Sequence, residues 1–150
     1  VAVYYKQNFY PHKEGIHLRL WHYDLIRFLP RSQLIAQWRE LNSIFAKEDK
    51  HILINYIYDY PPSHLYTYTK IVLDEFKVRG YTIRSFEKMD NYFSHHNVRI
   101  VDKLFEYEHN DEYLEICYFN LKEKYMRGQK DFDKKQFDAL HAYYKKRVKG

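Results

Sequence analysis

The chain is poor in glycine and has no long apolar run. Its four glycines stand far apart, at positions 15, 80, 128 and 150, so neither a phosphate-binding P-loop nor a dinucleotide fingerprint can be built. A membrane-spanning helix needs about 18 apolar residues in a row, and every apolar stretch here is much shorter. These absences argue against nucleotide-driven chemistry and against insertion into a membrane.

Cysteine is also scarce, and the histidines are not spaced as metal ligands. The single cysteine, Cys117, has no partner for an intramolecular disulfide, and its helical apolar neighbours predict a buried structural thiol. Nine histidines include no HExxH or HxxxH pair, and the adjacent His95 and His96 would point apart on a helix. No nucleophilic serine or cysteine signature is present either. We therefore expect no metal and no cofactor.

The 150 residues fit one compact domain. An apolar opening is interrupted at Lys6, which is not the pattern of a secretory leader, so we expect a cytoplasmic protein. The net charge of +5 is unevenly spread, because residues 121–150 hold ten Lys or Arg against four Asp or Glu. Such a basic segment suits a polyanion, although a solvated helix looks the same.

Helical periodicity predicts the main elements. A helix over 30–47 follows from Pro30 and an apolar stripe, and a helix over 62–79 ends at Gly80. Their stripes are Leu34, Trp38, Leu41 and Phe45 in the first helix, and Leu65, Tyr68, Val72 and Phe76 in the second. The two apolar faces should pack on each other.

Cap residues predict three further helices. Ser85 suits the start of a short helix over 86–93, and Asn110 or Asp111 suits the start of a helix over 111–127 that stops at Gly128. Asp131 is the expected cap of a last helix over 132–148, which either packs on the domain or faces DNA. Residues 94–108 fit a short helix or an extended piece. The fold class is all-α, a compact single domain with about three long helices plus shorter ones.

Arg39 and Glu40 stand side by side within the first predicted helix. Gln33, Gln37 and Glu40 form a stripe beside the apolar face, so the carboxylate should border the core. By this pattern alone, Glu40 could equally be a boundary residue paired with a lysine.

The run "LRLWHYDLIRFLPRSQLIAQWREL" resembles the start of the pyrimidine-dimer DNA glycosylases, the endonuclease V-like family. Those proteins carry Gln-His-Leu and then Tyr-Arg-Glu-Leu, where this chain has residues 32–34 and 38–41. The segment "DEFKVRGYTI" is similar to a helix end in the family. The opening "LRLWHYDL" and "YFNLKEKYMRGQKDF" resemble a bacterial branch that begins Met-Arg-Leu-Trp-His.

The resemblance implies a compact, metal-independent enzyme whose N-terminal amine attacks the sugar C1′ at a damaged pyrimidine. The base leaves, a Schiff base forms, and the strand is cut by β-elimination. An α-amine has a pKa of about 8, against about 10.4 for lysine, so a useful neutral fraction exists at physiological pH. By the family motif Glu40 is the catalytic carboxylate, and Arg39 is a phosphate contact or, alternatively, half of a surface ion pair. We expect further DNA contacts at His22, Gln33, Lys145 and Lys146.

Two family residues are replaced: Gln33 stands for the histidine and Ser43 for an arginine. Counting back from Glu40 brings the nucleophile position to Arg19, with Leu18 where the initiator methionine should stand, so the reacting amine belongs to residue 18 or 19. Residues 1–17 then either lie upstream of the true start or form a packed extension, and residues 18–150 form the glycosylase domain.

The expected function is therefore DNA repair: a glycosylase with abasic-site lyase activity on pyrimidine dimers or a related lesion. Its expected partner is damaged double-stranded DNA, bound by a monomer. Two other functions stay open, a non-catalytic nucleic-acid-binding helical domain and a protein-interaction module whose basic end is only a solvated surface.

Overall fold

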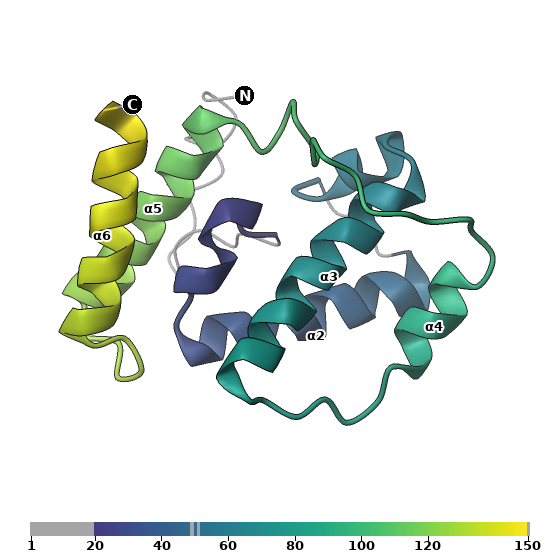
Figure 1. The fold of residues 1–150 in the computed structure, drawn as a ribbon, viewed down its shortest axis with the longest axis horizontal. Helices are drawn as coiled ribbons and strands as arrows, with labels where there is room; N and C mark the ends of the chain where they lie inside the picture. Colours follow the sequence, from purple (N-terminus) through teal and green to yellow (C-terminus); the bar gives the residue numbers. More distant parts are fainter. Residues whose placement is uncertain (1–19, 49, 51, 150) are drawn as a thin grey trace.

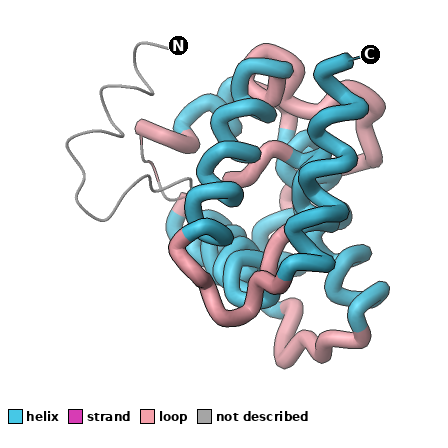
Figure 2. Tube along the Cα trace, turned by 90° about the vertical axis from the view of Figure 1, so that its left-hand side faces the viewer, coloured by secondary structure: helices cyan, strands magenta, loops and turns pink. Residues whose placement is uncertain are grey.

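The computed structural model describes residues 20–48, 50 and 52–149, and all regular structure in these ranges is helical (Figure 1). Figure 2 shows the helices joined by loops, with no strand in the described part of the chain. The all-α prediction is confirmed. The elements are η1 (Tyr23–Phe28), α2 (Arg31–Lys47), η2 (Asn55–Asp59), α3 (Pro62–Arg79), α4 (Glu87–Phe93), α5 (Asp111–Met126) and α6 (Lys134–Lys149).

The helices form two groups with η1 between them. α2 packs against α3 and α4, while α5 and α6 lie side by side and antiparallel (Figure 1). The short 3-10 helix η1 contacts α3 on one side and α5 and α6 on the other. Its buried residues Leu25 and Ile26 therefore belong to both halves of the core.

The long helices match their predicted ranges closely. Gly80 ends α3 in the left-handed conformation at φ 75°, and its N–H donates to the carbonyl of Lys77. The Asn110 side chain caps α5 by accepting from the N–H of Tyr113 at 2.8 Å. The predicted stripes lie largely in the core, and α3 packs on α2 as expected.

The predicted cap of the last helix is wrong. Asp133, directly before α6, accepts from the N–H of Gln136 at 2.8 Å, and the Gln136 side chain accepts from the N–H of Asp133 at 2.7 Å. Asp131 lies too far upstream to reach those amides. Instead its carboxylate accepts from the N–H of Ser32 at 2.7 Å, and so caps the start of α2.

Smaller elements were harder to foresee. The sequence did not predict η1 or η2, and residues 94–108 form turns and irregular loop rather than a helix or strand. α4 begins one residue later than expected, at Glu87, although the Ser85 hydroxyl does accept from the N–H of Glu87 at 3.1 Å. Among the described residues, no helix has the length and apolarity to cross a membrane.

Candidate active site

The backbone of residues 20–24, here called the lead-in segment, is held by buried side chains. The N–H of Trp21 donates to the side-chain oxygen of Gln37 on α2 at 2.8 Å. The Tyr68 hydroxyl of α3 donates to the carbonyl oxygen of Trp21 at 2.6 Å and lies 2.9 Å from the same Gln37 oxygen. Gln37 and Tyr68 are both buried, so this end of the chain is fixed between α2 and α3.

The other half of the molecule holds the same segment. The Tyr113 hydroxyl of α5 donates to the carbonyl of Leu20, and the N–H of His22 donates to the thiol sulfur of Cys117 at 3.4 Å. Cys117 is fully buried, as predicted, and burial raises the pKa of its thiol to about 12. A cysteine with this pKa is protonated at neutral pH, which suits a structural acceptor rather than a nucleophile.

Two buried histidines complete the cage around the lead-in segment. The Nδ1 atom of His109 accepts from the N–H of Tyr23 at 3.3 Å, so its Nε2 carries the proton and donates to the Tyr56 hydroxyl at 2.7 Å. The Nδ1 atom of His22 accepts from the N–H of Asp24 at 3.1 Å. Burial lowers the pKa of His22 to about 4 and that of His109 well below its ordinary value. Both rings are therefore neutral at physiological pH.

His22, which we expected to contact DNA, lies in the interior of the protein. Its side chain is 0% exposed and caps the start of η1. Its ring stacks on Tyr23, with centroids 4.7 Å apart, and lies against His109. The ring is enclosed by the core, and its hydrogen bond to the N–H of Asp24 helps to hold the lead-in segment.

Glu40 lies one helical turn beyond Gln37 on α2, on the same side of that helix. Its side chain is half-buried, so it borders the core as the stripe predicted, whereas Arg39 is exposed. Gln37 holds Trp21, so the carboxylate stands close along α2 to the point where the lead-in segment is fixed. The predicted nucleophile positions Leu18 and Arg19, like residues 1–17, fall outside the described residues.

Arg39 lines an open groove of about 550 Å³ between α2 and the segment that leads into α4. The other lining residues are Trp38, Asn42, Arg84, Ser85, Glu87 and Lys88. Within the described ranges Arg39 forms no ion pair, so the alternative role that we had left open for it is not realised there. The groove brings three cations together with one carboxylate.

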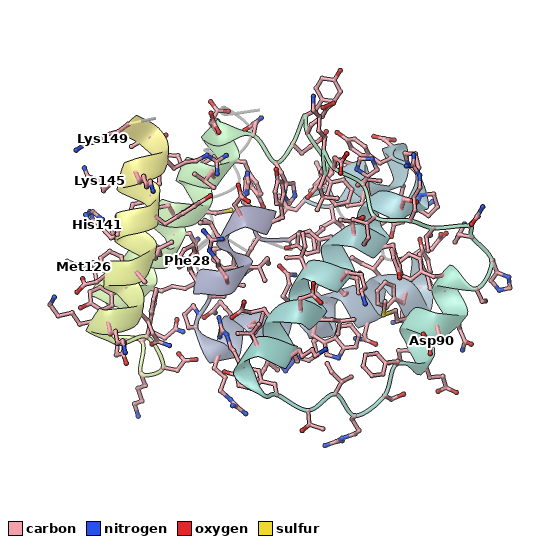
Figure 3. The ribbon with its side chains drawn as sticks, in the orientation of Figure 1. Phe28, Asp90, Met126, His141, Lys145 and Lys149 are labelled. Atoms are coloured by element: carbon pink, nitrogen blue, oxygen red, sulfur yellow. The ribbon has the colours of Figure 1, made fainter. Side chains whose placement is uncertain are left out.

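The other expected DNA contacts lie elsewhere. The Gln33 side chain, near the start of α2, accepts from the Gln129 amide at 2.7 Å. Lys145 and Lys146 are exposed on α6, where Lys145 points outward at one end of the molecule, while Asp90 on α4 marks the opposite end (Figure 3). The structure therefore does not bring these lysines to the groove beside Arg39.

Sequence reasoning missed Tyr68 and Tyr113 as holders of the lead-in segment, and Arg84 and Lys88 as groove cations. Tyr68 was assigned only to an apolar stripe, and nothing in the local pattern indicates where its hydroxyl points. Arg84 follows the end of α3 in a stretch without periodicity. Among the described residues, no group of His, Cys, Asp and Glu side chains is arranged to hold a metal ion.

Comparison with known proteins yields one match. Residues 18–89 match the family model described as pyrimidine dimer DNA glycosylase. No curated protein and no solved structure matches the chain significantly. The matched residues include the lead-in segment, Gln37 with Glu40, Arg39 with its groove, and all of α3. Over residues 18–89, just under half of its length, the chain is similar to the pyrimidine dimer DNA glycosylase family.

Proposed function

We propose that the chain is a DNA glycosylase and abasic-site lyase that uses an N-terminal amine and Glu40. The family match implies glycosylase action on pyrimidine dimers in DNA. The observation that carries the finer mechanism is the hydrogen bond from Trp21 to Gln37, one turn from Glu40. It fixes the chain two residues beyond position 19, on the helix that bears the carboxylate.

In the proposed reaction the amine at residue 18 or 19 attacks C1′ of the damaged nucleotide. The glycosidic bond breaks, the base leaves with the bonding electrons, and loss of a proton from nitrogen and opening of the sugar give an imine. The Glu40 carboxylate stabilises the positive charge that develops on the sugar and then accepts the C2′ proton. β-Elimination expels the 3′ phosphate, and hydrolysis of the imine releases the protein.

The identity of the amine is part of the proposal. A start at position 18, with methionine in place of Leu18, would put a free amine next to the fixed lead-in segment. Residues 1–17 would otherwise displace that amine from Glu40. We propose that residues 1–17 lie upstream of the true start. The intact mass of protein made from the native gene tests this, and a mass that includes those residues would contradict it.

DNA binding is proposed to centre on Arg39, because its exposed guanidinium is next to Glu40 in sequence and has no carboxylate partner among the described residues. Gln33, Lys145 and Lys146 would be outlying contacts, and His22 acts through the position of the backbone. The proposal includes a metal-independent monomer that acts on damaged double-stranded DNA in the cytoplasm.

Sodium borohydride trapping on UV-irradiated and abasic duplexes tests this proposal. Chains that start at Val1 and at position 18 are compared, each with native Glu40, with Glu40→Gln, and with Glu112→Gln as a control at an exposed carboxylate of α5. We expect an adduct from the shorter chain and its Glu112→Gln variant, and a strong loss with Glu40→Gln. Salt-dependent DNA binding without any adduct would favour a non-catalytic binding domain.

A further inference from the structure

The groove between α2 and α4, lined by the seven residues named above, concentrates positive charge. Arg39, Arg84 and Lys88 are exposed, and none of them forms an ion pair within the described chain. Two exposed cations outside the groove are paired instead, Arg127 with Glu123 at 3.2 Å and Lys134 with Asp138 at 2.7 Å. Glu87 is the single carboxylate of the lining, so the groove is net positive.

The walls of this groove are fixed by aromatic packing. Trp38 lies against Phe76 and Phe86, with centroids 6.4 and 6.1 Å apart, and so joins α2 to α3 and to the segment before α4. Two turns further along the same face of α2, Phe45 packs edge to face on Phe93 of α4 at 5.3 Å. These contacts hold Arg84 and Lys88 opposite Arg39 without using their charged groups.

Two neutral side chains in the lining already form hydrogen bonds within the protein. The Asn42 amide donates to the carbonyl of Trp38 at 2.8 Å, and the Ser85 hydroxyl accepts from the N–H of Glu87. Recognition in the groove therefore falls mainly to the guanidinium groups of Arg39 and Arg84 and the ammonium group of Lys88. Guanidinium and ammonium groups bind phosphate oxygens strongly, and they carry no preference for a base sequence.

We propose that this groove binds the sugar-phosphate backbone of DNA, with Arg84 and Lys88 as phosphate contacts in addition to Arg39. The inference rests on the proposed function, because Arg39 and Glu40 are neighbours on α2. Glu40 is not part of the lining, but it follows Arg39 on the same helix. A strand whose phosphates occupy the groove therefore lies along the helix that carries the carboxylate.

The test measures equilibrium binding of the position-18 chain to a duplex that carries a tetrahydrofuran abasic-site analogue, over a series of potassium chloride concentrations. The variant is Arg84→Ala with Lys88→Ala. Loss of two phosphate contacts should make the slope of log K against log salt shallower by about 1.8, since each contact contributes about 0.9. The difference in affinity from the native chain should shrink as salt rises.

Matched variants separate position from net charge. Lys103→Ala with Lys135→Ala removes the same charge from exposed sites outside the groove and should keep the native slope. Arg84→Lys with Lys88→Arg retains the charges and should also keep it. Circular dichroism and thermal unfolding confirm that each variant is folded, as expected for exposed side chains.

The outcomes distinguish the two proposals. If the native chain gives a borohydride adduct at saturating abasic DNA, but the Arg84 and Lys88 variant has the native slope, the groove assignment is overturned and the mechanism survives. The groove assignment is also overturned if the salt slope becomes shallower by the same amount in the groove variant and in the Lys103 and Lys135 variant. If the native chain neither binds nor gives an adduct, the proposed function falls, and the groove assignment falls with it.

Discussion

The side-chain oxygen of Gln37 accepts the N–H of Trp21 at 2.8 Å, although 16 residues separate the two in sequence. Both partners are buried, so water cannot replace either group. The bond makes the centre of α2 the reference point for the lead-in segment.

The Tyr68 hydroxyl should matter more for the chemistry than for the fold. Tyr68→Phe removes the hydrogen bond to the Trp21 carbonyl. Tyr118→Phe removes a comparable hydrogen bond, between α5 and His141 of α6. Each change should cost about 1 kcal/mol of unfolding free energy. Only Tyr68→Phe should slow formation of the borohydride-trapped adduct, with the DNA dissociation constant unchanged. Equal rates for the two variants would show that the lead-in segment does not need this hydrogen bond for catalysis.

Asp131 should stabilise α2 rather than α6. Burial alone would raise the pKa of Asp131, but hydrogen bonds from Gln129 and Ser32 lower it, so the carboxylate is ionised at neutral pH. Asp131→Ala should cost about 1 kcal/mol in urea unfolding, as loss of a helix cap does. Asp138→Ala, at an exposed ion pair, should cost less than about 0.5 kcal/mol. A larger loss of unfolding free energy in Asp138→Ala than in Asp131→Ala would contradict this assignment.

The two buried histidines should make the protein sensitive to acid. His22 has a pKa of about 4 in the folded state, and that of His109 is also lowered, whereas unfolded histidine titrates at about 6.5. The unfolded chain therefore binds more protons below pH 6.5, and the free energy of unfolding should fall as pH drops towards 4. Each histidine contributes a slope of up to about 1.4 kcal/mol per pH unit.

Urea unfolding between pH 7.5 and 4.5 measures that slope. His22→Asn keeps a side-chain acceptor for the N–H of Asp24 but cannot gain a proton, so it should flatten the dependence. His96→Asn changes an exposed ring and should leave the native slope. If the native chain, His22→Asn and His96→Asn all show the same slope, His22 is not a source of the acid sensitivity.

The Cys117 thiol should be inert while the protein is folded. It is fully buried, and burial raises its pKa to about 12, so both access and thiolate formation are suppressed. In urea at pH 8, Ellman's reagent should react with the thiol within the mixing time. In native buffer it should react only as fast as the folded protein opens to expose Cys117. Fast labelling of the native protein would contradict the burial of this residue.

Periodicity and local capping were enough to predict the main helices, because α2 and α3 each carry one long apolar stripe and Gly80 ends α3. The site was only half predictable. Glu40 and Arg39 could be found from a motif, but the contacts of Gln37 with Trp21 and Tyr68 join residues far apart in the chain. Asp131 illustrates the same limit: its position in sequence suggests a cap for α6, whereas the folded chain brings it to α2.

η1 packs between the two helical groups, so it links residues inside the family match to residues beyond it. The family match ends at residue 89, yet the lead-in segment is also held by Tyr113, Cys117 and His109, which lie beyond it. A fragment ending after α4 would lose these partners and expose the apolar face that η1 turns towards α5 and α6. The matched portion is thus not a separable module, and changes within α5 can alter the geometry of the lead-in segment, although α5 contributes no proposed catalytic group.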